Sequence, residues 1–326
     1  MSLILTLLVS FALTALLGRV CIPALRALKA GQSIREIGPN WHKSKEGTPT
    51  MGGIMFITAC VICVVAGGWT AMVAGEYEHL MVLGFALIYG AIGFADDFVK
   101  VVRKRNLGLT ALQKLILQLA VALAYLGLLR WNGNLTCELY IPFADVSFTV
   151  NWVVYLIFAT FVIVGCVNAV NLTDGVDGLA SGVTVPVMVF FAVTAWAWGS
   201  ETLALLPAAL VGGLLGFLCY NFHPAKVFMG DTGSLFLGGA VCGMAFALDM
   251  PLVLILVGIV YIVEAVSVIM QVAYFKATHG KRIFRMTPIH HHFEMGGWSE
   301  VKIFAVFTGI TALMCLLAGL GICNRF

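Results

Sequence analysis

Residues 152–172 read WVVYLIFATFVIVGCVNAVNL, an uncharged stretch of the length that a helix needs to cross a bilayer, about 20 residues. Further stretches of similar character lie on both sides of it. Together they give ten predicted spans, at 2–20, 51–71, 79–95, 113–130, 152–172, 179–199, 203–220, 233–248, 251–274 and 303–323. The sequence therefore predicts an all-α, polytopic membrane protein with ten transmembrane helices, built as a single domain over residues 1–326.

The composition excludes most soluble classes of protein. Of the 326 residues, 61% are hydrophobic and 11% are charged, whereas soluble chains are about 25% charged. A soluble globule has no interior large enough for so much apolar surface. The net charge of +3 is too small to indicate a nucleic-acid partner. We therefore expect membrane lipid around the chain and no nucleic acid.

The loops that alternate along the ten spans differ sharply in charge. One set, at 21–50, 96–114, 221–232 and 275–302, holds 16 of the 19 Lys and Arg residues. Because basic loops remain in the cytoplasm, both termini are predicted to lie outside. Cys137, in the longest outer loop, is then expected to be accessible from outside.

Five aspartates lie at the cytoplasmic ends of the spans or in the inner loops: Asp96, Asp97, Asp174, Asp177 and Asp231. A carboxylate near the hydrocarbon edge is unfavourable and usually marks a function. Carboxylate oxygens hold Mg²⁺, and Mg²⁺ with lysine neutralises phosphates in transfer reactions. Glu264 lies inside a predicted span, where a site residue, a helix-to-helix hydrogen bond and a broken helix all remain open.

The stretch FADDFVK (94–100) carries two of these acids and a lysine. Adjacent residues of a helix point about 100° apart, so Asp96 and Asp97 suit divided roles, one toward a metal and the other toward a reacting group. Lys100 follows about one turn later and can lie on the same face.

Two further loops combine glycines with acids. In NAVNLTDGVDG (168–178), Asn171, Asp174 and Asp177 recur at every third position, and the glycines let a ligand approach the backbone. In FMGDTGSL (228–235), Asp231 between glycines is a good ligand for a hard cation. Phe228 in the same loop is either a stacking platform for a base or a membrane-surface anchor.

Two basic segments complete the inner face. The stretch TPIHHHFE (287–294) follows Lys281, Arg282 and Arg285, and histidines beside cations suit phosphate oxygens and proton transfer. The stretch KSKEGTPTMGG (43–53) is a basic, glycine-rich entry to a helix, where amide groups attract anions. The chain has no ATP-binding P-loop, HExxH or GxSxG motif. These features predict magnesium-assisted phosphoryl chemistry at the inner membrane face.

Five strings closely resemble, in order, those of the phospho-N-acetylmuramoyl-pentapeptide transferase family: GTPTMGG (47–53), FADDFVK (94–100), NAVNLTDGVDGLA (168–180), FMGDTGSL (228–235) and TPIHHHFE (287–294). The resemblance implies a cytoplasmic active-site cleft in the bacterial cell (inner) membrane. It also implies Mg²⁺-dependent transfer of phospho-MurNAc-pentapeptide from UDP-MurNAc-pentapeptide to undecaprenyl phosphate, giving lipid I and UMP. Exchange of one diphosphate linkage for another needs no ATP, which agrees with the missing P-loop.

The resemblance implies roles for single residues as well. Asp96, Asp97, Asp231 and His290 would be catalytic, and Asp231 and Asp97 would hold the metal. Asp96 would deprotonate the lipid phosphate or act as a nucleophile. Substrate contacts would come from Lys45, Thr50, Lys100, Lys114, Asn171, Asp174, Asp177, Asn221, Phe228 and His291. Leu112 stands where the family often carries a basic residue.

Two other functions stay open at this point. A polyprenyl-phosphate GlcNAc-1-phosphate transferase shares the aspartate motifs, although we expect its histidine loop to differ. A secondary transporter would also show ten spans, but its acids would lie near the bilayer midplane. The five aspartates here crowd one face instead. A homodimer is open too.

Overall fold

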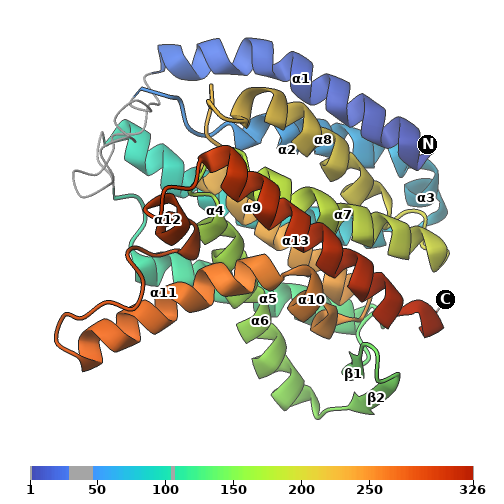
Figure 1. Cartoon of the computed structure of the whole chain (residues 1–326). Coiled ribbons are helices and arrows are strands. Elements are labelled where there is room, and N and C mark those ends of the chain that lie inside the picture. The colour runs from blue at the N-terminus through green and yellow to red at the C-terminus, as the bar shows by residue number, and fades with distance from the viewer. Residues whose placement is uncertain (1, 29–46, 104–106, 326) are drawn as a thin grey trace.

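The computed structural model describes residues 2–28, 47–103 and 107–325, and it is mostly helical (Figure 1). The first half contains α1 (Leu3–Ala27), α2 (Gly53–Gly67), α3 (Trp69–Ala74), α4 (Glu78–Val102), α5 (Ala111–Trp131) and α6 (Trp152–Thr173). The second half contains α7 (Leu179–Ala197), α8 (Leu205–Asn221), α9 (Gly230–Ala247), α10 (Leu254–Val257), α11 (Ile259–Ala277), α12 (Ile289–Glu294) and α13 (Glu300–Gly321). Short 3₁₀ turns lie at Pro251–Val253 and Cys323–Arg325.

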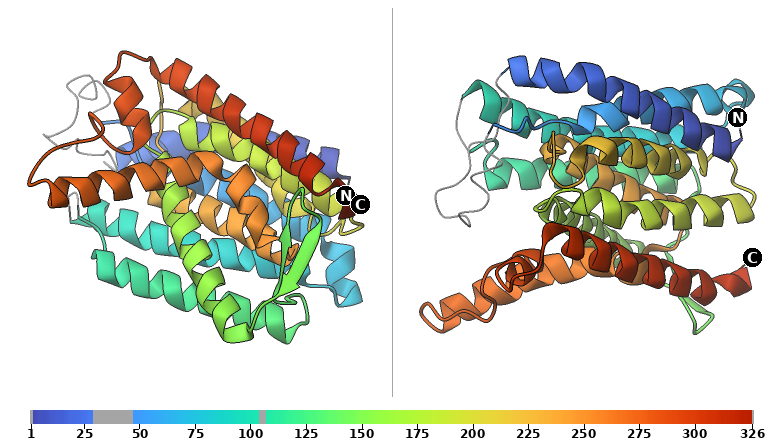
Figure 2. Two further views of the ribbon diagram at one scale, coloured as in Figure 1. Left: turned by 60° about the horizontal axis from the view of Figure 1, so that its bottom comes forward. Right: turned by 45° about the horizontal axis from the view of Figure 1, so that its top comes forward.

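Seven helices of the described part are long and apolar enough to cross a membrane: α1, α4, α5, α6, α7, α11 and α13. This confirms the prediction of a helical, multi-pass membrane protein. The remaining predicted spans coincide with α2, α8 and α9, which have 15, 17 and 18 residues. The described N- and C-terminal residues lie at the same end of the bundle, and α12 lies toward the opposite end (Figures 1 and 2).

Close packing of α4 against α9 brings two of the sequence motifs together. A Cβ atom built on Gly93 of α4 would lie 2.0 Å from the carbonyl oxygen of Asp231, so only glycine fits there. Further along the same interface, a Cβ on Gly239 of α9 would lie 3.0 Å from the Cα of Ala86. Small residues allow helix backbones to approach closely within a membrane. The contact places the C-terminal end of α4 beside the first turn of α9.

A small hairpin between α5 and α6 departs from the predicted all-α fold. Its strands, β1 (Glu138–Ile141) and β2 (Val146–Thr149), pair antiparallel with Glu138 opposite Thr149. The backbone N–H of Phe143 donates to the carbonyl of Gly321, 3.0 Å away, and so joins the hairpin to the end of α13.

The structure also corrects the expectation that Cys137 is accessible. The residue is 4% exposed, and its thiol accepts a hydrogen bond from the Arg130 guanidinium at 3.4 Å. The fold of the segment between α5 and α6 therefore shields this thiol. Cys323, near the C-terminus, is exposed instead.

Candidate active site

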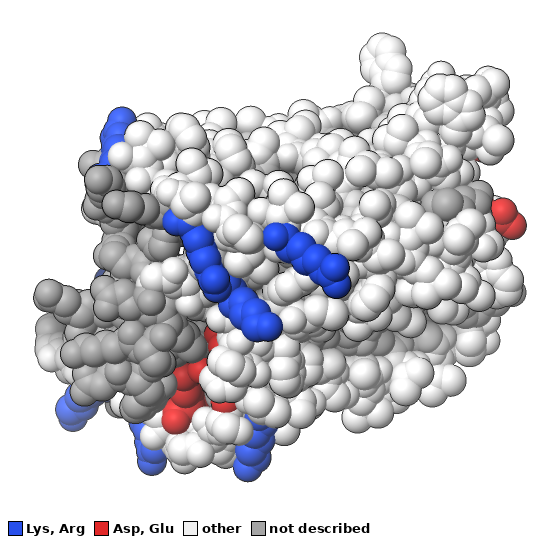
Figure 3. Space-filling view, turned by 90° about the horizontal axis from the view of Figure 1, so that it is seen from above, with Lys and Arg blue, Asp and Glu red and all other residues white. Residues whose placement is uncertain are grey.

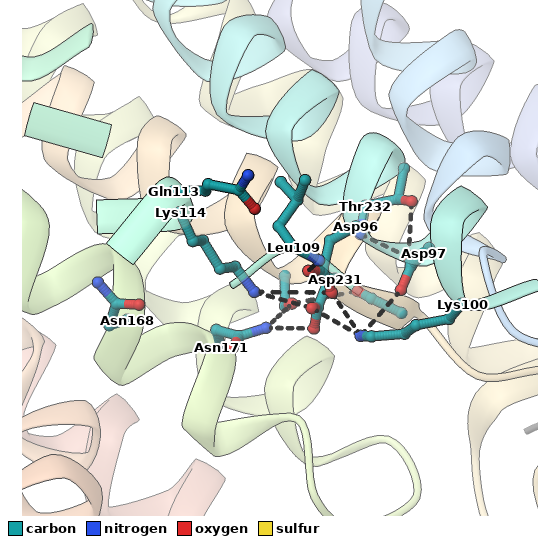
Figure 4. A network of polar contacts seen from close by, with 12 residues as sticks. Asp96, Asp97, Lys100, Leu109, Gln113, Lys114, Asn168, Asn171, Asp231 and Thr232 are labelled. Atoms are coloured by element: carbon teal, nitrogen blue, oxygen red, sulfur yellow. Dashed lines mark hydrogen bonds and ion pairs between the residues drawn. The ribbon is translucent and has the colours of Figure 1, made fainter. Parts of the chain in front are cut away.

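The three acids predicted to be catalytic meet at one point in the structure. Asp96 and Asp97 belong to the last two turns of α4, and Asp231 belongs to the first turn of α9. One carboxylate oxygen from each lies within 4.8 Å of the others. Figure 4 shows these side chains directed toward one another, with Lys100 and Lys114 reaching in from either side.

Two lysines hold the acids together. The Lys100 ammonium lies 2.6 Å from Asp96 Oδ2 and 3.6 Å from Asp97 Oδ1. It also lies 2.9 Å from Asp231 Oδ2. Lys114, from the first turn of α5, reaches the same Asp231 oxygen at 2.8 Å. The prediction that Lys100 shares a face with both aspartates of α4 is therefore confirmed.

Asp96 and Asp97 have different partners, although both are buried. Asp97 Oδ2 accepts hydrogen bonds from the Thr232 amide at 2.9 Å and from the Thr232 hydroxyl at 2.8 Å. Asp96 Oδ1 accepts from the Leu109 amide at 2.8 Å. Each acid is thus fixed through one oxygen, while its other oxygen faces the lysine.

Asn171 ties the end of α6 to this cluster. Its amide nitrogen donates to Asp231 Oδ1 at 2.8 Å and lies 2.7 Å from Ser234 Oγ. Thr232 and Ser234 were not predicted as site residues. Their position beside Asp231 in the glycine-rich loop was the only sequence signal for them.

Asp174 follows directly after α6 and is half-buried. Burial, together with the negative charges of Asp231 and Asp97, raises the pKa of the Asp174 carboxyl well above its ordinary value. The negative charge of the acid cluster therefore makes ionisation of Asp174 less favourable.

Two groups of described residues could hold a metal ion, and they differ in donor type. The group Asp96, Asp97 and Asp231 offers only carboxylate oxygens, which suit a hard cation such as Mg²⁺. Lys100 and Lys114 neutralise part of the charge of the three carboxylates and leave a formal excess of one negative charge, which favours a bound cation. The residues present fit the predicted magnesium site.

The second group is Asp177, His223 and Glu300, which mixes oxygen and nitrogen donors. His223 Nδ1 lies 3.0 Å from Asp177 Oδ2 and 3.6 Å from Glu300 Oε1. The Asp177 amide donates to Glu300 Oε2 at 3.0 Å. Sequence reasoning did not select His223 or Glu300, because nothing in their spacing relates them to Asp177.

The loops that carry Thr50 and Phe228 run side by side. The Phe228 amide donates to the carbonyl of Pro49 at 2.8 Å, and the Gly52 amide donates back to the carbonyl of Phe228 at 2.9 Å. Gly230 lies between Thr50 and Asp97. A Cβ atom built on Gly230 would be 2.8 Å from the Thr50 hydroxyl oxygen and 2.6 Å from Asp97 Oδ2. Thr50 therefore borders the acid cluster.

The remaining predicted residues lie around this core. Asn221 is buried and donates to the carbonyl of Val227 at 2.9 Å, which fixes the loop before Phe228. His290 is fully buried on α12, and His291 beside it lies 2.9 Å from Glu294. Lys45 lies outside the described residues.

The Lys and Arg side chains are unevenly distributed over the face that Figure 3 shows. In Figure 3, Lys and Arg gather on the left and centre with one group of acidic side chains among them, and the right-hand third shows no Lys or Arg. On this face the Lys and Arg side chains therefore lie away from the right-hand end, where one acidic side chain is visible at the edge.

Comparison with known proteins relates this arrangement to a family. Residues 79–249 match the family model for glycosyl transferase family 4, and residues 45–57 match signature 1 of phospho-N-acetylmuramoyl-pentapeptide-transferase. A phospho-N-acetylmuramoyl-pentapeptide-transferase of Halalkalibacterium halodurans is 48% identical over 97% of this chain and 96% of its own length. The protein of that name from Caldanaerobacter subterraneus is 49% identical over 94% of both chains. The chain therefore belongs to glycosyl transferase family 4 and, within it, to the phospho-N-acetylmuramoyl-pentapeptide-transferases.

Proposed function

We propose that this protein transfers phospho-MurNAc-pentapeptide from UDP-MurNAc-pentapeptide to undecaprenyl phosphate. In this reaction an oxygen of the lipid phosphate forms a bond to the phosphorus of the phosphate that is attached to MurNAc. The bond from that phosphorus to UMP breaks, so that lipid I and UMP are the products. The observation that carries the proposal is the cluster of Asp96, Asp97 and Asp231 with two lysines, in a chain that matches its relatives over nearly all their length.

The two lysines supply positive charge where a diphosphate would bind. Lys100 and Lys114 both contact Asp231, so their ammonium groups are held in place before any substrate arrives. Positive groups that are already oriented stabilise the negative charge on a transferring phosphoryl group. The donor diphosphate would bind against these two side chains.

Asp96 is the residue that would act on the acceptor. Its Oδ2 faces the cluster while its Oδ1 is fixed by the Leu109 amide. A carboxylate held in this way can take a proton from the lipid phosphate or attack phosphorus directly.

Asp231 and Asp97 would hold Mg²⁺. When bound, the ion would supply further positive charge to the diphosphate oxygens. The all-oxygen donor set of these residues supports that assignment.

The nucleotide part of the donor would lie over the loops that border the cluster. The residues proposed to contact the donor are Lys45, Thr50, Asn171, Asp174, Asp177, Asn221, Phe228 and His291. The half-buried ring of Phe228 supports this, because base stacking is the sequence-tolerant way to bind a nucleobase.

We further propose ten transmembrane helices, with both termini outside and the cleft in the cytoplasm of a bacterial cell. The position of both described chain ends at one end of the bundle supports an even number of crossings (Figure 2). The 16 basic residues in alternate loops support the orientation. All of residues 1–326 would form this one domain.

A two-donor assay tests the proposal. The purified protein is incubated with undecaprenyl phosphate, Mg²⁺ and either UDP-MurNAc-pentapeptide or UDP-GlcNAc, and released UMP and lipid product are measured. We expect turnover of the muramoyl donor and little of UDP-GlcNAc. Efficient turnover of UDP-GlcNAc alone would assign the protein to GlcNAc-1-phosphate transfer. Absence of UMP with either donor would refute transferase activity.

A further inference from the structure

A buried pair of side chains joins α11 to α12. His290 Nδ1 lies 3.0 Å from Glu264 Oε2, and both side chains are fully shielded from solvent. The His290 amide lies 3.5 Å from the same oxygen. Glu264 is the acid for which the sequence left three explanations open, and the structure gives it a histidine partner.

The other edge of the His290 ring reaches the loop after α6. A Cβ atom built on Gly175 would lie 2.3 Å from His290 Nε2 and 2.7 Å from its Cε1. Gly175 directly follows Asp174, in the loop that we assign to the donor nucleotide. The imidazole therefore extends from Glu264 to the backbone of a substrate-binding turn.

The two ring nitrogens have different surroundings. Nδ1 faces a carboxylate, which can only accept, so Nδ1 carries the proton in this contact. Nε2 is buried and makes no hydrogen bond with any residue that the structure describes. Such an unpaired buried polar atom is unfavourable and is usually retained for a function.

We propose that Glu264 is a positioning residue for His290, an inference that rests on the proposed function. By accepting a hydrogen bond from the Nδ1–H group, Glu264 leaves Nε2 unprotonated and aims it at the Asp174–Gly175 turn. There the Nε2 edge of the ring packs against the Gly175 backbone and fixes the turn that presents Asp174 to the donor nucleotide. The arrangement follows the general rule that the hydrogen bond at one imidazole nitrogen sets the role of the other.

The first experiment reads the tautomer directly in the substrate-free protein. ¹⁵N spectra of histidine-labelled protein are recorded for the wild type, and the His290 signals are assigned from their loss in His290→Asn. We expect a protonated Nδ1 and an unprotonated Nε2. In Glu264→Leu, which removes the acceptor at similar volume, this pattern should be lost. A wild-type ring protonated at Nε2 alone would overturn the proposal.

The second experiment separates positioning from a purely structural role. Glu264→Leu should lower kcat/KM by about 10- to 100-fold, by analogy with the loss that follows removal of the carboxylate partner of a metal-ligating histidine. In the His290→Asn background the same change should cause no further loss, because Glu264 acts only through that ring. Equal losses in both backgrounds would contradict the inference.

Two further variants keep the test decisive if Glu264→Leu folds poorly. Glu264→Gln retains an acceptor oxygen and should recover most of the activity. Gly175→Ala should reproduce the loss from the other side, because the new methyl group must displace the ring edge. Wild-type activity in Gly175→Ala with an unchanged ¹⁵N pattern would argue against the role of Nε2. If the wild type releases no UMP from any donor, the proposed function fails while the ¹⁵N result still decides the tautomer.

Discussion

The strongest test of the magnesium assignment is Asp231→Asn. The amide keeps the shape of the side chain but removes one of three carboxylates, all of which face Lys100. Asp231 also binds Lys114, and its side chain is 19% exposed. The substitution therefore removes a charge from the centre of the cluster without opening a cavity.

The size of the effect follows from electrostatics. At a separation of about 4 Å, two unit charges interact by about 1 kcal/mol in water and about 4 kcal/mol near a protein surface. A divalent ion doubles these figures. Because Asp231 is partly exposed and lies between two lysines, we take the lower value of about 2 kcal/mol, which is about 30-fold in affinity.

The assay is UMP release at increasing Mg²⁺ concentration. Asp231→Asn should need at least about 30-fold more Mg²⁺ for half-maximal activity, and its maximal rate should be low, since the remaining ligands no longer hold the ion in position. The matched control is Asp249→Asn, at the other end of the bundle, where the carboxylate accepts a hydrogen bond from Thr136. Asp249 has a positive φ of 50°, which asparagine tolerates. An unchanged Mg²⁺ requirement in Asp231→Asn, or wild-type turnover in excess chelator, would refute the reasoning.

Three further predictions concern stability, packing and topology. The pKa of Asp174 is raised in the folded state, so ionisation of this carboxyl destabilises the fold as the pH rises above the ordinary aspartate range. Asp174→Asn should therefore raise the melting temperature more at pH 8 than at pH 5. An equal rise in melting temperature at both pH values would contradict this. Gly93→Ala should lower both melting temperature and activity because its methyl group meets α9, whereas Gly84→Ala on the same helix has open space and should be silent; equal effects would show that the interface is loose. With the other cysteines replaced by serine, Cys323 should react with a membrane-impermeant thiol reagent in intact cells. A single cysteine introduced at Lys281 should not react. The reverse result would contradict the proposed topology.

Most of the helices could be predicted from local sequence. In a bilayer every backbone N–H and C=O group must be hydrogen-bonded within the protein. An apolar stretch of the length of residues 152–172 is therefore expected to form a helix. The ends were less predictable. The helix that begins at Glu78 continues to Val102 and not to residue 95, because its last turns carry Asp96 and Asp97, which pair with Lys100 and bond to the start of α9.

Part of the site was also predictable from spacing along one helix. Asp96, Asp97 and Lys100 are within four residues of one another, so helical periodicity alone brings them together. The family resemblance added Asp231 as a partner. No local sequence pattern, however, predicts how closely α4 and α9 pack, and that packing brings Asp231 to Asp96 and Asp97.

The sequence by itself thus determined that the chain is a helical membrane protein with its chemistry-bearing residues in the basic loops and at the adjoining helix ends, since hydrophobic length and charge act locally. Tertiary structure alone decided which loops meet. Lys114 reaches Asp231 across 117 positions, Asp177 meets Glu300 across 123, and His290 finds Glu264 inside the bundle. These pairings depend on how closely the helices pack. Small residues such as Gly93 permit this close packing, but no single segment of the sequence specifies which helices meet.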